Sequence, residues 1–268
     1  MEKFIVLEKA VGETPLSCAE AFRATRPDLV GIPLSYAGRL DPMASGKLLV
    51  LIGEECKHQA DYHGLDKEYE FSVLFGISSD TQDVLGRLKA GADVVEIFFK
   101  NLNDITRSLV GELTFSYPLF SAKTVKGKPL HMWTLEGRLD EIEIPTRTST
   151  IYELELTNIK TLTRAEVADQ ALAKIETIPE VTDPRKALGN DFRRVDVRQD
   201  WQNIKNNPNL PETYTVATFC CIASSGAYMR TLATLIAEKI GTTGLAYHIH
   251  RTKIGHYNEE KQAWDSLF

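Results

Sequence analysis

Residues 38–46 read Gly38-Arg39-Leu40-Asp41-Pro42-Met43-Ala44-Ser45-Gly46, and the apolar run Leu48-Leu49-Val50-Leu51-Ile52 follows almost at once. The glycines and the proline indicate a loop, and the apolar run is typical of a buried strand. A single aspartate therefore lies in a loop anchored by a rigid strand, where catalytic groups concentrate. Aspartate beside proline is also common in Asx-turns, and the loop taken alone favours that structural role for Asp41.

Outward from this loop, the spacing of apolar residues predicts strands and helices in an irregular order. Strands are expected at residues 4–7, 48–52, 69–75, 148–157, 215–223 and 247–257, with a strand and then a loop at 112–123. Helices are expected from Thr14 until Pro27, at 101–109, from a capping box at 163–166 to about residue 178, and at 228–240. Residues 78–93 are polar and loop-like. This order predicts a mixed α/β (α+β) fold whose largely antiparallel central sheet is flanked by helices.

The chain is expected to form one domain over residues 1–268. Its 43% hydrophobic content suffices for a sizeable core. The stretch 179–212 is rich in Asn, Asp, Arg and Pro, and it is the best candidate for an insertion or a mobile element. The apolar stretches are too short to cross a bilayer, and the first residues lack the pattern of a secretory signal. We therefore expect a monomeric protein in the cytoplasm, without a membrane partner.

Three further patterns bear on partners and cofactors. The four cysteines form no CxxC pair, which favours reduced thiols. His248 and His250 share a strand face but lack a third ligand at zinc-like spacing, so no metal site is expected. No glycine-rich nucleotide loop follows a strand, and no cofactor is expected. The net charge of −6 argues mildly against a non-specific nucleic-acid coat protein, although local basic clusters matter more for RNA binding than the total.

Seven stretches resemble the TruB-type pseudouridine synthases in the family's own order, from Lys9 to Gly255. The loop at 38–46 resembles the catalytic motif Gly-x-Leu-Asp-Pro-x-Ala-[Ser/Thr]-Gly. The other stretches are Lys9-Ala10-Val11-Gly12-Glu13-Thr14-Pro15, Lys67-Glu68-Tyr69, Gly76–Asp83 with Gly86, Pro118–Lys123 with Gly127-Lys128, Ser224–Arg230, and Arg251-Thr252-Lys253-Ile254-Gly255. Together they define a site rather than a fold alone.

The resemblance implies the role of three residues in the reaction. Asp41 would be the catalytic aspartate, acting as a nucleophile or as a base. Tyr69 would stack against the flipped target base, and its hydroxyl could transfer a proton. Arg230 would pair with Asp41 and keep the carboxylate ionised. Taken alone, Tyr69 would be read as an inward-facing strand aromatic, and Arg230 as a surface arginine in a weak salt bridge.

The resemblance also implies a substrate-binding set. Arg39 lies in the catalytic motif, Ile249 would pack near the base, and Lys9, Lys67 and Lys123 would contact phosphates, which position RNA without reading its sequence. One departure concerns Tyr36-Ala37, because the family usually carries His-[Ser/Thr] before the loop glycine. Tyr36 could stack on a base in place of that histidine.

The function implied is therefore the isomerisation of uridine to pseudouridine in RNA, at uridine 55 in the T-arm of tRNA. The alternative is a non-catalytic RNA-binding or RNA-folding protein on the same scaffold. Many members of the family continue into a small C-terminal RNA-binding domain, and we expect none here. This weakly favours a tRNA enzyme that works alone over one that depends on a guide RNA.

Overall fold

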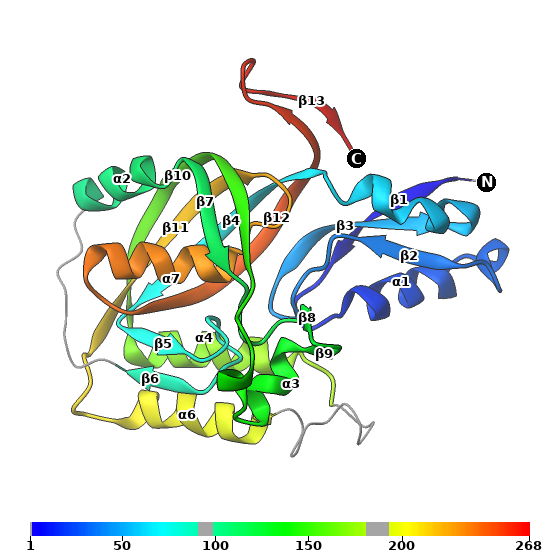
Figure 1. The fold of residues 1–268 in the computed structure, drawn as a ribbon. Coiled ribbons are helices and arrows are strands. Elements are labelled where there is room, and N and C mark those ends of the chain that lie inside the picture. The colour runs from blue at the N-terminus through cyan, green and yellow to red at the C-terminus, as the bar shows by residue number, and fades with distance from the viewer. Residues whose placement is uncertain (1, 91–98, 181–192) are drawn as a thin grey trace.

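The computed structural model describes residues 2–90, 99–180 and 193–268. In this part of the chain a nine-stranded sheet has the order β1-β3-β12-β4-β11-β10-β7, with β2 added on β3 and β13 on β12 (Figure 1). Its strands are β1 (Phe4–Lys9), β2 (Leu34–Ala37), β3 (Ser45–Ile52), β4 (Asp66–Phe75), β7 (Gly111–Ser116), β10 (Thr146–Thr163), β11 (Thr213–Ala223), β12 (Gly244–Asn258) and β13 (Ala263–Leu267). Two small hairpins pair β5 (Ile77–Ser79) with β6 (Leu88–Ala90) and β8 (Thr124–Val125) with β9 (Lys128–Pro129).

The sheet is mixed, which corrects the expectation of a largely antiparallel one. Strands β3 and β12 run parallel, with Ser45 opposite His250 and Gly46 opposite Arg251, whereas the neighbouring pairs β1–β3 and β12–β4 are antiparallel. Gly46 permits this close approach, because a Cβ there would lie 2.2 Å from the Arg251 carbonyl oxygen. Apolar spacing reveals where strands lie but not the direction of a partner some two hundred residues away.

The helices confirm the predicted capping signals. They are α1 (Pro15–Ala24), α2 (Phe99–Ser108), α3 (Leu130–Leu135), α4 (Arg164–Glu176), α6 (Arg194–Asn206) and α7 (Met229–Ile240), with 3₁₀ turns at Pro27–Leu29, Gly53–Tyr62 and Leu139–Glu141. Thr14 caps α1, and Thr163 caps α4 in a reciprocal bond with Glu166. Gly241 ends α7 in the left-handed conformation.

One apolar core joins the central strands to α4, α6 and α7. Helix α7 lies against β12 and β4, and α6 packs on α4 (Figure 1). Two smaller clusters lie under the β1–β3 end of the sheet, and one of them is covered by α1. This packing fixes the start of β3, which directly follows the loop with Asp41, and the start of α7, which carries Arg230.

The stretch 179–212 is only partly described. Residues 181–192 lie outside the described part of the chain. The residues after them form helix α6, which buries Val197, Trp201 and Ile204 in the main core, and the Trp201 indole donates to the Val84 carbonyl at 2.9 Å. The second half of the stretch is therefore a packed helix.

Candidate active site

Arg251 fixes the loop that carries Asp41. Its side chain is 1% exposed and donates from Nε to the Lys47 carbonyl at 2.7 Å and from Nη2 to the Gly38 carbonyl at 3.1 Å, with a longer contact from Nη1 to the Arg39 carbonyl at 3.5 Å. A buried arginine needs such acceptors because an unpaired buried charge is costly. The loop is thus tied at both ends to β12. The motif that contains Arg251 does not by itself reveal this role.

Arg230 holds the Asp41 carboxylate in a two-point fork. Arg230 Nε lies 2.8 Å from Asp41 Oδ2, and Nη2 lies 3.3 Å from Oδ1. The Arg230 side chain is 4% exposed, whereas that of Asp41 is 41% exposed. One side of the carboxylate is therefore fixed by a buried cation, and the other is open to a substrate. The structure brings these two sequence-predicted residues together.

Asp83 completes the surroundings of Arg230, and sequence reasoning had not singled it out. Its carboxylate is 3% exposed and lies 3.8 Å from Arg230 Nε. It accepts hydrogen bonds from the Thr81 hydroxyl at 2.6 Å and the Leu85 amide at 2.9 Å. Burial raises the pKa of Asp83, and the attraction of Arg230 opposes that rise. The only earlier signal was its place in the stretch Gly76–Asp83.

The two acidic neighbours control the pKa of Arg230. Burial of the guanidinium alone would lower this pKa, but the charges of Asp41 and Asp83 reverse the effect, so the pKa is raised. Arg230 also donates from Nη1 to the Thr81 carbonyl at 2.7 Å and from Nη2 to the Phe120 carbonyl at 3.4 Å. Arg230 is therefore a permanently charged, fully engaged partner for Asp41.

Tyr69 lies in the same row of the sheet as the end of the loop that carries Asp41. Gly46 of β3 stands opposite Arg251 of β12, which stands opposite Tyr69 of β4. Two strand spacings put the Tyr69 backbone about 10 Å from the loop end. Tyr69 is half-buried against the main core, and Ile249 of β12 is 4% exposed in that core.

The three lysines expected at phosphates differ sharply in exposure. Lys9 is 0% and Lys67 is 6% exposed. The Lys9 ammonium donates to the carbonyls of Ala10 and Glu13, and that of Lys67 donates to the Leu65 carbonyl. Burial lowers the pKa of each of the two lysines to about 8. Both ammonium groups are thus engaged with the chain's own carbonyls.

Lys123, by contrast, is exposed, and its ammonium lies 4.9 Å from the centre of the Tyr117 ring. Arg39 is also exposed, directly beside Leu40 and Asp41 in the loop. Tyr36 of β2 is half-buried against the cluster formed by Cys18, Ala19, Leu48 and Val50 under α1. The Arg39 and Lys123 cations therefore face solvent, while the Tyr36 ring packs toward α1.

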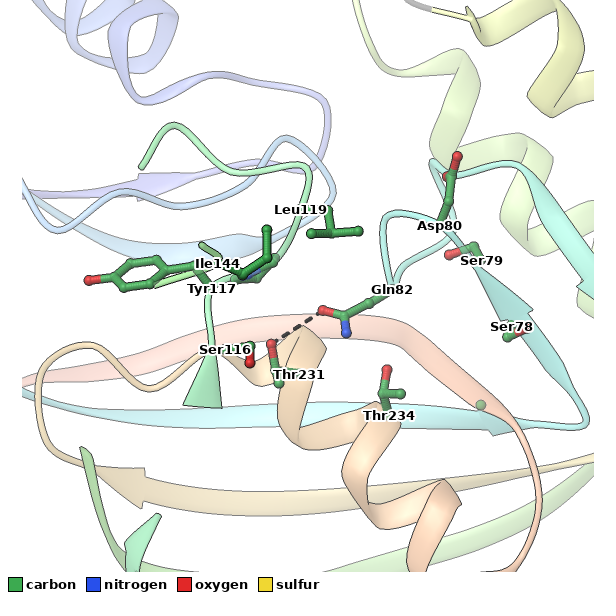
Figure 2. Close-up of a pocket in the computed structure, with 12 residues that line it drawn as sticks. Ser78, Ser79, Asp80, Gln82, Ser116, Tyr117, Leu119, Ile144, Thr231 and Thr234 are labelled. Carbon is green, nitrogen blue, oxygen red and sulfur yellow. Dashed lines mark hydrogen bonds between the residues drawn. The ribbon is translucent and has the colours of Figure 1, made fainter. Parts of the chain in front are cut away.

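A pocket of about 440 Å³ lies beside the start of α7. Figure 2 shows Thr231 and Thr234 of α7 on one side, Gln82 on a turn opposite, and Leu119 and Tyr117 along the rim. The Thr231 hydroxyl contacts Gln82 Oε1 at 3.2 Å. Asp41 is not among the residues that line it. The pocket neighbours the carboxylate–arginine pair through Thr231, which follows Arg230 on the helix.

His248 and His250, for which no metal site is expected, both lie on β12. The His248 and His250 rings stack with centroids 6.4 Å apart, and His250 Nδ1 lies 2.9 Å from the Ser45 hydroxyl. Burial lowers the pKa of His248 to about 4. In the ranges that the structure describes, no three His, Cys, Asp or Glu side chains gather as metal ligands. Nor do those ranges contain a helix of the length and apolarity needed to cross a membrane.

Comparison with known proteins places this geometry in a family. The family model described as "TruB family pseudouridylate synthase (N terminal domain)" matches residues 33–171, more than half of the chain. A "tRNA pseudouridine synthase B" of Caldicellulosiruptor saccharolyticus is 28% identical over 95% of this chain and 68% of the relative. Another, of Caldanaerobacter subterraneus subsp. tengcongensis, is 37% identical over 46% of this chain and 42% of that relative.

Solved structures extend the likeness to the fold of nearly the whole chain. A chain of a Cbf5-Nop10-Gar1 complex superposes with a TM-score of 0.53 at 15% identity, covering 94% of this chain. The match spans 49% of the solved chain, so this protein corresponds to about half of its length. The matched family model includes the Asp41 loop, Tyr69 and Lys123. The chain belongs to the TruB family of pseudouridylate synthases.

Proposed function

We propose that this protein isomerises uridine to pseudouridine in RNA, and that its substrate is uridine 55 in the T-arm of tRNA. The observation that carries the proposal is the Asp41–Arg230 fork, in which a buried cation fixes a carboxylate whose other side is 41% exposed. A protein that only binds RNA has no use for an acidic group held open toward an anionic ligand. The names of the curated relatives supply the substrate class.

The reaction breaks the C1'–N1 glycosidic bond, turns the uracil and joins C1' to C5, after which the hydrogen at C5 leaves as a proton. Asp41 has the position for either chemical role, as a nucleophile toward the substrate or as a base that removes a proton. In both routes the carboxylate must be ionised when RNA excludes water from it. Arg230 stabilises that ionised form through the two hydrogen bonds of the fork.

We assign the remaining residues to two groups by their exposure. Arg39 and Lys123 present cations to the RNA backbone, and the half-buried Tyr69 ring offers a face on which the flipped base rests, with Ile249 in the core against which Tyr69 packs. We do not assign Lys9 and Lys67 to phosphate contacts, because their ammonium groups bind carbonyls inside the protein. In this proposal they support the segments around the catalytic loop.

We further propose that the protein acts as a monomer in the cytoplasm, without a cofactor. The reaction is redox-neutral and the thiols of Cys18 and Cys221 are free and buried, as suits a reducing compartment. Size-exclusion chromatography with light scattering, alone and with tRNA, tests the stoichiometry. A protein dimer in the RNA complex would contradict the monomer.

The test of the activity uses a tRNA transcript that carries tritium at C5 of its uracils. Formation of the new C–C bond releases that tritium to water, so counts in water report turnovers. We expect release from a tRNA with uridine at position 55 and none from the same tRNA with cytidine there. Equal release from both transcripts would refute the site, and tight binding without any release would favour a binding protein.

A further inference from the structure

Two loops supply carbonyl acceptors to the Arg230 guanidinium, in addition to its fork with Asp41. Its Nη1 donates to the carbonyl of Thr81, in the turn between β5 and β6, and its Nη2 contacts the carbonyl of Phe120, in the loop after β7. These two carbonyls orient the guanidinium and so fix the geometry of its fork with Asp41. Whatever ties these two loops together therefore sets the position of the guanidinium.

Arg193, just before α6, touches both loops. Its guanidinium lies 4.3 Å from the centre of the Phe120 ring, a cation–π contact. Its Nη1 lies 2.5 Å and its Nη2 3.4 Å from the two carboxylate oxygens of Asp80, which precedes Thr81. The Arg193 side chain is 17% exposed. One planar cation thus bridges the two segments that supply the acceptors of Arg230.

Asp80 is the residue through which this bridge reaches the turn. Its Oδ1 accepts from the Arg87 amide at 2.9 Å, and its own amide donates to the Arg87 carbonyl at 3.2 Å. A Cβ on Gly86 would lie 2.6 Å from the same Oδ1. The Asp80 carboxylate therefore closes the turn from which Thr81 and Asp83 reach Arg230. Asp80 also lines the pocket, and in Figure 2 its side chain points away from Gln82.

The backbone at Arg193 indicates that its placement matters. Its φ is 63°, in the left-handed region, which is unfavourable for a residue with a long side chain. Its Nε is buried and has no hydrogen-bond partner within the described residues. The helix that follows is anchored beside the same turn, because Asp200 of α6 pairs with Arg87 at 2.7 Å. Strain of this kind persists only where neighbouring contacts enforce it.

We propose that Arg193 is a positioning residue for the reaction, a clip that joins the Asp80 turn to Phe120 and so holds Arg230 in its fork with Asp41. This inference rests on the proposed function for its effect on turnover, but its structural part does not. It also gives α6, which lies in the stretch 179–212 and outside the seven stretches that resemble the family, a role at the active site.

The test compares Arg193→Ala and Arg193→Lys with Arg198→Ala. Arg198 pairs with Glu176 at 2.6 Å and so ties the same helix to α4. We expect Arg193→Ala to slow single-turnover tritium release roughly 2- to 30-fold, the range of coupling through contacts of this kind, with tRNA affinity changed less than about 2-fold. Lysine restores the ion pair but not the planar stacking, so it should recover part of the rate. Arg198→Ala should behave as the wild type.

A second measurement is independent of turnover. Proton exchange at Arg230 Nε–H, followed by NMR in protein labelled with ¹⁵N-arginine, should be faster in Arg193→Ala and unchanged in Arg198→Ala. Should Arg193→Ala fail to fold, Phe120→Leu is the alternative variant, because it removes the ring contact and keeps the carbonyl. It should likewise slow tritium release and speed proton exchange at Arg230.

Three outcomes are distinguishable. If Arg230 proton exchange is faster in Arg193→Ala but the wild type releases no tritium, the clip is supported and the proposed function is refuted. Unchanged exchange and unchanged rate would overturn the clip. A weakened tRNA affinity with an unchanged rate would also overturn it, because Arg193 would then be an RNA contact.

Discussion

Replacing Arg230 by methionine should destabilise the protein by an amount that depends on pH. The substitution leaves the buried carboxylate of Asp83, 3% exposed, without its cation. Removing one partner of a buried pair costs about 3–5 kcal/mol. The ion pair between Arg230 and Asp41 adds little to this loss of stability, because the Asp41 side chain is 41% exposed and partly screened by water.

The sign of the pH dependence follows from the pKa of Asp83, which burial raises. The folded state therefore binds the Asp83 proton more tightly than the unfolded state does. The stability that this adds is complete below the pKa of the unfolded chain and is lost as pH rises through the folded-state pKa. Arg230 holds the folded-state pKa down, so Arg230→Met should raise it further. The loss of stability relative to the wild type should therefore grow from pH 5 to pH 8.

Urea unfolding followed by tryptophan fluorescence at the two pH values measures this difference. The matched control is the double variant Asp83→Asn with Arg230→Met, in which the stranded charge is gone. At pH 8 the double variant should regain most of the free energy of unfolding that Arg230→Met loses. A loss that is equal at both pH values, or a double variant no more stable than Arg230→Met alone, would show that the unpaired Asp83 charge is not its cause.

Three further predictions concern the base, the backbone and the sheet. Tyr69→Phe should slow tritium release more than it weakens tRNA binding, because the ring remains to stack; equal rates would remove the hydroxyl from the mechanism. The affinity for tRNA should fall steeply with salt, and Lys123→Ala should reduce the slope of log affinity against log salt by about one; a flat response would contradict the phosphate contact. Burial lowers the pKa of His248 to about 4, so stability should fall as pH drops from 6.5 toward 4, by roughly 2 kcal/mol at pH 5. His248→Gln should remove that part of the pH dependence. If the free energy of unfolding by urea falls with pH as steeply in His248→Gln as in the wild type, His248 is not its cause.

Local signals predicted most of the regular structure. Helices α1, α4 and α7 begin or end at residues whose side-chain or backbone chemistry is nearly decisive, such as Thr163 and Gly241. Helix α6 was missed because the Asn, Asp and Pro around it suggested a loop. Its buried residues Val197, Trp201 and Ile204 have helical spacing and could have revealed it.

The hairpin of β5 and β6 was hidden in a polar segment expected to be a loop, because its strands are three residues each. Strands β2 and β13 were likewise not predicted, and they lie off the main path of the sheet. The parallel pairing of β3 and β12 depends on contacts between the two ends of the chain. Spacing within a strand does not carry that information.

For the site, the motifs identified Asp41 and Arg230, and the structure places them in contact. Burial is what the motifs could not supply. The resemblance implied that Lys9 and Lys67 contact phosphates, and lysine is normally exposed, yet both are buried against carbonyls. Arg251, at 1% exposure, supports the loop through contacts with three carbonyls that are distant in sequence.

The variant Asp41→Asn tests whether the Asp41 carboxylate performs the chemistry. Asparagine keeps the shape and the half-exposed place of the side chain while removing its charge, so the fold and the affinity for tRNA should be retained. With saturating tRNA tritiated at C5 of uracil, we expect binding as tight as that of the wild type and no release of tritium to water. Release at a rate near that of the wild type would show that the chemistry does not need the carboxylate.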